Sequence, residues 1–274
     1  MNDDRLPAQR GGAKALLLTV LGEFVLPAGG SAWTASLLEA AGALGIGEKN
    51  ARQALSRIAD DGLIESSRHG RQVRWTLTPA GRSLLESGTE RIYSFGRSAD
   101  RADAWGGEWL VVHCPVAEER RAARNRLRTQ LAFLGFGELS PNLFVSPHVE
   151  RDASMRSILT ELEVLATATV LRSRTPGTGD DTALAARAWD LDQLAADYGA
   201  FSELHRGVRP VGDADSFTAL VELVHDWRRF PFVDPELPPE LLPTDWAGAT
   251  AVDDFHELHA RWSPAARSWL AERS

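Results

Sequence analysis

The apolar residues at the start of the chain recur at helical spacing in three successive stretches. Residues 13–26 form a nearly continuous apolar run that a proline and glycine turn closes. A second stretch follows Ser31 and Thr34, either of which is suited to cap a helix. The third runs from about Glu48 to Gly62. Its apolar stripe consists of Ala51, Ala54, Leu55 and Ile58. Three helices are therefore predicted before residue 63.

The next segment, LIESSRHGRQVRWTL, changes to a period of two and predicts a β-hairpin. Gly70 lies at its centre, and we expect His69 to be a turn residue with positive φ, not a titrating group. In the second strand, Val73, Trp75 and Leu77 alternate with polar residues, so one face packs and the other meets solvent. Three helices followed by a hairpin are typical of a winged helix-turn-helix. A helix over 79–95 is expected to lead out of it.

From residue 108 the pattern becomes strand, helix, strand, strand, helix, strand. EWLVVHCPV predicts the first strand and residues 118–135 an amphipathic helix; FGEL, NLFVSP, SMRSILTELEVLA and TATVLRS supply the other four elements. This βαββαβ order is that of a ferredoxin-like fold. A polar, turn-rich linker follows at 174–181, and the remainder has helical patterns interrupted by prolines at 233–243.

These patterns predict an α+β chain of three domains. A winged-helix DNA-binding domain with its exit helix is expected at 1–96, and a ferredoxin-like middle domain at 97–176. A mainly helical C-terminal domain at 177–274 would serve effector binding, dimerisation or both. A length of 274 residues suits two or three domains of ordinary size.

Composition excludes several classes of protein. The chain is 43% hydrophobic and 25% charged, which is ordinary for a globular protein. A single cysteine, Cys114, cannot form an internal disulfide or a multi-cysteine metal site, and it suits a reducing cytoplasm. The apolar run at 13–26 predicts a buried helix in place of a signal peptide or membrane span, because Glu23 interrupts it and a span needs about 20 residues. We therefore expect a cytoplasmic protein with no membrane partner.

Charge is unevenly distributed along the chain. Residues 46–82 carry seven Lys or Arg against four Asp or Glu, a net of +3, so a total of -8 leaves -11 for the remainder. A local basic footprint of this kind indicates a nucleic-acid contact. On the third helix, Arg52 can pair with guanine, whereas Asn50 and Gln53 can pair with adenine. The predicted DNA-binding residues are Lys49, Asn50, Arg52, Gln53, Arg57, Arg68, Arg71 and Arg74.

Alternatives to DNA contact stay open at this point. Many winged helices bind proteins, and any exposed helix carries charges. Arg57 lies near the edge of the apolar stripe, where it can instead pair with Asp60 or Asp61. The arginines of the helix at 118–135 either extend a phosphate track or form a solvated face, and we favour the solvated face.

No catalytic, cofactor or metal site is predicted. Cys114, in an apolar strand, is expected to be a core residue, since His113 points to the other side of that strand. His256 and His259 in HELH are three residues apart with no third ligand in view, whereas a zinc motif on a helix spaces its histidines by four. Neither a P-loop nor a dinucleotide-binding glycine pattern is present.

Several motifs together resemble a known family. They are ARQALSRIADDGLI with RHGRQVRWTLTPAG, EWLVVHCPV through LRTQLAFLGFGELSPNLFVSPH, and RRFPFVDPELPPELLPTDWAGATA. Over nearly the whole chain the sequence resembles the PaaX-type transcriptional repressors, which control phenylacetate degradation in bacteria. The resemblance implies a homodimer that binds double-stranded operator DNA and is released by an acyl-CoA such as phenylacetyl-CoA. It carries DNA-reading roles over to Arg52, Gln53, Ser56 and Arg57 of the ARQALSR motif.

An acyl-CoA needs cations for its phosphates and apolar surface for its acyl group. Trp227, Arg228, Arg229 and Trp246 flank the proline-rich signature and are the effector-binding candidates. The alternative is that these tryptophans only hold the third domain together, and we favour it.

The middle domain also resembles the small CRISPR-associated ferredoxin-like nucleases, which suggests a metal-dependent nuclease as a rival function. Such an enzyme needs a metal-binding aspartate at the end of its first strand. Here that strand ends His113-Cys114-Pro115-Val116. A protein-interaction scaffold without catalysis is the remaining alternative.

Overall fold

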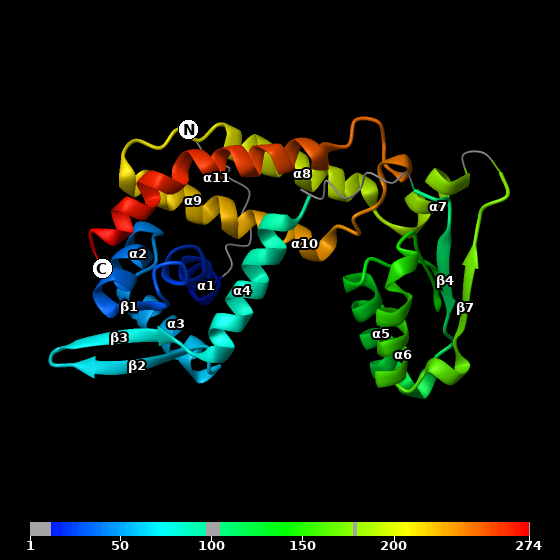
Figure 1. Ribbon diagram of the computed structural model, residues 1–274, viewed down its shortest axis with the longest axis horizontal. Coiled ribbons are helices and arrows are strands. Elements are labelled where there is room, and N and C mark those ends of the chain that lie inside the picture. The colour runs from blue at the N-terminus through cyan, green and yellow to red at the C-terminus, as the bar shows by residue number, and fades with distance from the viewer. Residues whose placement is uncertain (1–11, 97–104, 178–179, 274) are drawn as a thin grey trace. The chain divides into compact units, whose positions relative to one another are not determined.

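The computed structural model describes residues 12–96, 105–177 and 180–273 and is of the α+β class (Figure 1). It divides into two compact units, each continued by later parts of the chain. The first comprises residues 1–95, 202–228 and 253–274, and the second comprises 96–201 and 229–252. The residues of the predicted C-terminal domain are thus shared between the two units, and helices α8 and α11 contribute to both.

The N-terminal part of the first unit contains four α-helices and one antiparallel sheet. Its elements are α1 (Ala13–Val20), a π-helical turn (Leu21–Val25), β1 (Ser31–Trp33), α2 (Thr34–Ala43), α3 (Glu48–Asp60), β2 (Ile64–His69), β3 (Gln72–Leu77) and α4 (Pro79–Ser94). The predicted buried helix at 13–26, the third helix and the exit helix are confirmed. Leu17, Leu37, Leu55 and Ile58 are at most 1% exposed, and they fill the core between α1, α2 and α3.

Two local predictions in this region are wrong. Ser31 does not cap a helix but starts strand β1, which pairs with β3 so that the sheet order is β1-β3-β2. Trp33 is the residue before α2 and makes no side-chain cap. The hydroxyl of Thr34 instead donates to the carbonyl of Val73 at 3.0 Å.

His69 was expected in the turn, but it is the last residue of β2 and pairs with Gln72. The turn consists of Gly70 and Arg71, and Gly70 alone adopts the positive φ, at 62°. Glycine takes this conformation without the steric penalty that a Cβ atom brings. His69 therefore lies on a regular strand, where its ring meets the ring of Trp33 edge-on at 5.6 Å.

The second unit is built on a four-stranded antiparallel sheet of order β5-β6-β4-β7. Its strands and main helices are β4 (Trp109–His113), α5 (Arg121–Phe133), β5 (Gly137–Ser140), β6 (Leu143–Ser146), α6 (Asp152–Glu161), β7 (Thr169–Ser173) and α7 (Asp180–Ala188). Short 3-10 turns lie at Glu118–Arg120, Val149–Arg151, Leu165–Thr167 and Pro239–Leu241.

Successive side chains of a strand point to opposite faces of the sheet. Apolar residues pack on both faces here. Leu110, Val112 and Cys114 pack with the apolar residues of α5 and α6. Trp109 and Val145 pack on the other face with α7 and the segment around Leu237–Leu241. Cys114 is fully buried, as predicted, and burial raises the pKa of its thiol.

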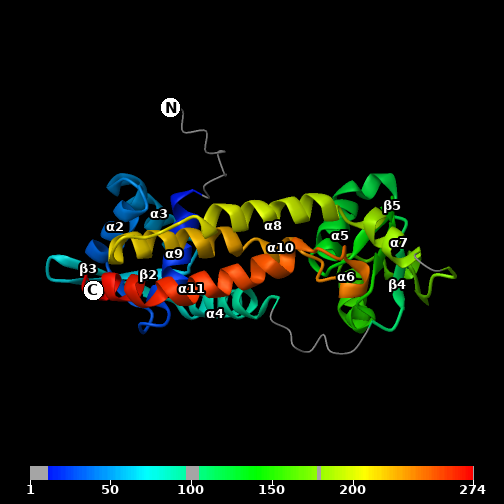
Figure 2. The same cartoon turned by 90° about the horizontal axis from the view of Figure 1, so that it is seen from above.

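The remaining helices are α8 (Leu191–Arg206), α9 (Asp213–Trp227), α10 (Phe230–Val233) and α11 (Ala247–Ala271). Within the first unit, α9 and α11 lie side by side (Figures 1 and 2), and ring contacts such as Trp227 on Phe255, 4.7 Å between centroids, join them. The same pair of helices packs on the N-terminal core, where Phe217 contacts Phe24 and Trp269. Among the described residues, no helix has the length and apolarity that crossing a membrane requires.

Candidate nucleic-acid interface

All nine residues predicted to bind DNA are exposed on the first unit. Six lie on α3, and three lie on the β2–β3 hairpin, which projects from the helices (Figure 1). They are Lys49, Asn50, Arg52, Gln53, Ser56, Arg57, Arg68, Arg71 and Arg74. The apolar stripe of α3 is buried at Ala51, Ala54, Leu55 and Ile58, which turns the opposite, polar face to solvent.

The N-terminal turn of α3 carries an ion pair that the sequence spacing allows. Glu48 lies 2.8 Å from the guanidinium of Arg52, four residues later on the same face. Both side chains are more than half exposed, so this pair is weak and open to competition from an anion. Arg52 is thus held near the helix start, where reading side chains of a recognition helix lie.

The C-terminal end of α3 is tied to the rest of the unit. Asp61, the residue after the helix, pairs with Lys14 at the start of α1. The carboxylate of Asp61 is thus paired with Lys14 and not with Arg57. Among the residues that the structure describes, Arg57 makes no ion pair. Its guanidinium stays available on the surface of α3.

The hairpin arginines do not share one face. Arg74 is opposite Ser67 in the β2–β3 register, whereas Arg68 is opposite Val73, whose side chain points to the packed face. Because neighbouring residues of a strand point to opposite sides, Arg68 and Arg74 emerge on different faces of the hairpin. Arg71, in the turn between them, lies at the tip.

Trp33 supports Arg74, and sequence reasoning missed it. It lies opposite Arg74 in the β1–β3 register, and the guanidinium carbon is 5.4 Å from the centre of its ring. A cation stacked on an aromatic face is held in place while its donors remain free for a phosphate. No sequence signal indicated this role, because β1 is only three residues long and Ser31 and Thr34 resemble helix caps.

The hairpin is anchored to α2 by a pair of hydrogen bonds. Trp75 donates through its indole N–H to the hydroxyl of Thr34 at 3.0 Å, and that hydroxyl donates to the Val73 carbonyl. At the base, Thr78 accepts from the amide of Gly81 and donates to the carbonyl of Gly62. These contacts fix the hairpin relative to the helices.

Arg82 contributes to the local positive charge but not to the exposed reading surface. Its guanidinium donates to the Gly29 carbonyl at 3.3 Å and lies 3.7 Å from Glu86. This arginine therefore stabilises the turn after the π-helical segment.

Three family models together match most of the chain. A "PaaX-like protein" model matches residues 12–81, a "PaaX protein central Cas2-like domain" model matches 102–185, and a "PaaX-like protein C-terminal domain" model matches 189–272. The chain belongs to the PaaX family. Among curated relatives, the "Transcriptional repressor PaaX" of Escherichia coli strain K12 is 31% identical in an alignment of 272 residues that covers 94% of this chain and 83% of that protein.

A solved structure with the same fold is the uncharacterized protein Rv0674 from Mycobacterium tuberculosis. It has a TM-score of 0.64 and 23% sequence identity, and the match covers 95% of this PaaX-family chain and 99% of that one. At this identity the likeness shows the fold alone.

The four effector-binding candidates are divided between the two units of this PaaX-family chain. In the first, Trp227 is fully buried and donates to the Ile92 carbonyl at 3.2 Å, and burial lowers the pKa of Arg228. In the second, Arg229 pairs with Asp197 at 3.4 Å, and Trp246 meets the ring of Tyr198 edge-on. Trp227 and Trp246 each pack within their own unit, which favours the structural interpretation of the two tryptophans.

The middle region has no acidic residue at the end of its first strand. β4 ends at the exposed His113, and the next carboxylates, Glu118 and Glu119, lie in a 3-10 turn before α5. Within 12–96, 105–177 and 180–273, no three His, Cys, Asp or Glu side chains are grouped as a metal site would require. The HELH motif is accounted for otherwise, because His259 contacts Glu23 and Tyr93.

Proposed function

We propose that this protein is a DNA-binding transcriptional repressor. The observation that carries the proposal is the exposed set of basic and amide side chains on α3 and the β2–β3 hairpin, in a chain with a net charge of -8. The repressor name of the Escherichia coli relative supports a regulator in place of the rival nuclease.

In this proposal the N-terminal elements form a winged helix-turn-helix, with α3 as the recognition helix and the hairpin as the wing. The order α1, α2, α3, hairpin and the antiparallel β1-β3-β2 sheet support it. Asn50, Arg52, Gln53 and Ser56 would read base edges, whereas Arg71 and Arg74 would hold phosphates. The middle region would be ferredoxin-like, which its antiparallel β5-β6-β4-β7 order supports.

The family membership supports further parts of the proposal. The repressor would be a cytoplasmic homodimer that an acyl-CoA such as phenylacetyl-CoA releases from its operator. The domain division at residues 96 and 176 belongs to the same proposal, with the C-terminal part serving the effector, the dimer or both. The three family models match residues 12–81, 102–185 and 189–272, which supports a division into three parts.

The direct test is fluorescence anisotropy with duplexes from upstream of the gene that encodes this chain. We expect tight binding to one such duplex, weaker binding to its scrambled version, and an affinity that falls steeply as salt rises. Equal affinity for both duplexes would overturn the proposal. Phenylacetyl-CoA, added to the preformed complex, is expected to lower the anisotropy, with phenylacetate and free coenzyme A as controls. Incubation with Mg²⁺ or Mn²⁺ tests the rival, since a nuclease would cleave the duplex.

A further inference from the structure

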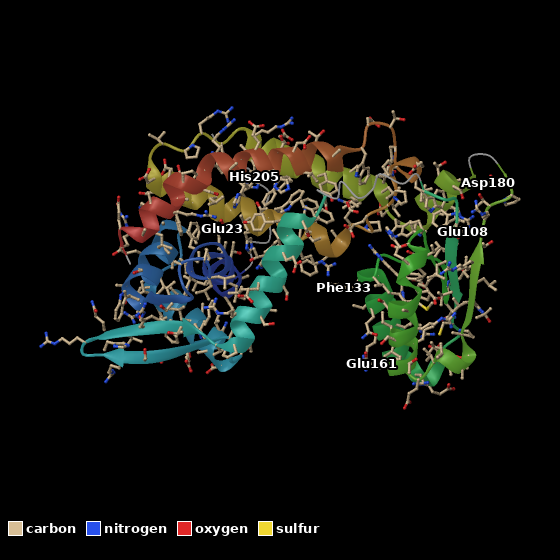
Figure 3. All side chains as sticks on the ribbon, in the orientation of Figure 1. Glu23, Glu108, Phe133, Glu161, Asp180 and His205 are labelled. Atoms are coloured by element: carbon tan, nitrogen blue, oxygen red, sulfur yellow. The ribbon has the colours of Figure 1, made fainter. Side chains whose placement is uncertain are left out.

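The first unit contains a cluster of polar side chains that the proposed DNA contact does not use. We call it the Glu23 cluster, and its members are Glu23, Tyr93, His259 and Arg267 (Glu23 is labelled in Figure 3). The side chain of Glu23 is only 4% exposed. The cluster joins three helices that are distant in sequence, because Tyr93 belongs to α4 and the two basic residues belong to α11.

Both carboxylate oxygens of Glu23 have partners. Oε2 accepts from the hydroxyl of Tyr93, and Oε1 lies 3.0 Å from Nε2 of His259 and 3.4 Å from Nη2 of Arg267. The Tyr93 oxygen is also 3.0 Å from His259 Nε2. One side chain thus holds α4 and α11 at the same time.

The position of Glu23 depends on an irregular backbone. Residues Leu21–Val25 form a π-helical turn, in which the amide of Leu26 donates to the carbonyl of Leu21 at 2.8 Å. Single π-helical turns are rare in proteins, and those that occur are frequently found at functional sites. Glu23, Phe24 and Val25 are all buried, so the turn places a carboxylate among apolar neighbours.

A buried carboxylate is an inefficient way to stabilise a core. Burial on its own would raise the pKa of Glu23, but the hydrogen bonds and charges of His259, Tyr93 and Arg267 outweigh it and lower that pKa. Apolar residues of similar volume often stabilise as well as such a cluster, and the best-supported benefit of a buried polar group is a fixed registry between elements. Here the elements whose registry is fixed are α11, α4 and the end of α1.

The same helices continue to the candidate DNA-reading surface. α1 packs directly against α3 and is paired with its end through Lys14 and Asp61. Just after the end of α11, Arg273 lies 3.1 Å from Glu39 of α2, and the Arg273 carbonyl accepts from Ser36 of the same helix. A shift of α11 would therefore move both helices that support α3.

Helix α11 lacks one backbone hydrogen bond between the two residues that contact Glu23. Pro264 lies inside the helix, between His259 and Arg267, and cannot donate the backbone hydrogen bond of its turn. The hydroxyl of Ser263 donates to the His259 carbonyl at 2.6 Å beside this break. The two contacts to Glu23 hold α11 on both sides of the proline.

We propose that the Glu23 cluster is the latch through which α11 fixes α1 and α3 in the arrangement that binds operator DNA. This inference rests on the proposed repressor function and adds a regulatory element to it. None of the cluster residues is expected to touch DNA. Opening the latch lowers the fraction of molecules able to bind, which weakens every DNA complex by the same factor.

The test measures the dissociation constants for operator and scrambled duplexes at several salt concentrations, with the full chain carrying Glu23→Gln, Tyr93→Phe or His259→Gln. We expect at least fivefold weaker operator binding in Glu23→Gln, with the operator-to-scrambled ratio and the salt slope unchanged. Tyr93→Phe removes only one hydroxyl, so this variant should fold even if Glu23→Gln does not. We expect Tyr93→Phe to weaken operator binding about threefold. In the double variant Tyr93→Phe, His259→Gln the two losses should not add, because both act through Glu23.

The matched control is Glu257→Gln, which removes the exposed pair of Glu257 with Arg261 on the same helix. It should leave affinity unchanged. Folded Glu23→Gln and Tyr93→Phe variants that bind the operator within twofold of the native chain would overturn the latch. A changed operator-to-scrambled ratio would also overturn it, because it would show an effect on base reading. A native chain that does not distinguish the duplexes would instead refute the repressor function itself.

Discussion

Helices α3 and α5 are both thirteen residues long and carry several basic side chains, yet these charges have different partners. On α5, three arginines have carboxylate partners from three other places in the second unit (Figure 3 labels Glu161). The pairs are Arg124 with Glu118, Arg126 with Glu161, and Arg128 with Glu138, at 2.7 to 2.9 Å. On α3, the one ion pair within the helix is Arg52 with Glu48.

The difference shows why an arginine count in a sequence is a poor guide to nucleic-acid binding. An arginine that is paired with a carboxylate must lose that ion pair before it can bind a phosphate. An unpaired arginine loses only its bound water molecules. The bidentate pair with Arg124 also lowers the pKa of Glu118. The solvated-face interpretation of α5 is therefore favoured over a second phosphate track.

The largest effect is expected from the wing. In the double variant Arg71→Gln, Arg74→Gln, two charge-assisted phosphate contacts are lost, each worth about 1.5 kcal/mol or more. The affinity should fall for operator and scrambled duplexes alike. The slope of log affinity against log salt should become shallower by roughly 1.8, at about 0.9 for each contact. An unchanged slope in anisotropy titrations would show that the hairpin does not meet the backbone.

Arg52→Ala should weaken operator binding less than the double wing variant does. It should reduce the preference for operator over scrambled DNA more. We expect a loss of about 1–3 kcal/mol on the operator and little on scrambled DNA, because a base contact is lost. Competition assays with single-base operator variants would locate the base that Arg52 reads. Arg126→Ala on α5 is the matched control, and an equal loss there would remove the distinction between the helices.

A smaller effect tests whether Glu48 competes for Arg52. Glu48→Gln removes an exposed i,i+4 pair worth about 0.3–0.5 kcal/mol, so DNA affinity should rise about twofold at low salt. The equivalent change on α5, Glu118→Gln, frees Arg124 and should leave DNA affinity as it is. A similar rise in both variants would mean that α5 also contacts DNA.

The smallest effect is expected from neutralising α5. The triple variant Arg124→Gln, Arg126→Gln, Arg128→Gln should bind the operator within twofold of the native chain. Its stability should fall only slightly, because exposed ion pairs contribute little to folding. Urea unfolding measured beside the DNA titration separates these two effects.

Much of the local structure could be predicted, because it depends on neighbours in the sequence. The stripe of Ala51, Ala54, Leu55 and Ile58 fixed which face of α3 is buried, and the alternation in β3 fixed which residues pack. The burial of Cys114 followed from the same alternation, which continues one residue beyond β4. The error at Ser31 concerns a residue whose conformation depends on pairing with Thr76 in a distant part of the sequence. The error at His69 misplaced the hairpin turn by one residue, because His69 still pairs with Gln72.

The sequence by itself determined the order of helices and strands, the faces they bury, and the segregation of positive charge between residues 46 and 82. These properties are periodic or additive along the chain, so they can be read without coordinates. Only the tertiary structure decided which charges are free. It paired the α5 arginines, stacked Arg74 on Trp33, and brought Glu23 to a tyrosine and a histidine 70 and 236 residues away. Such contacts depend on which elements pack together, and no local pattern encodes that choice.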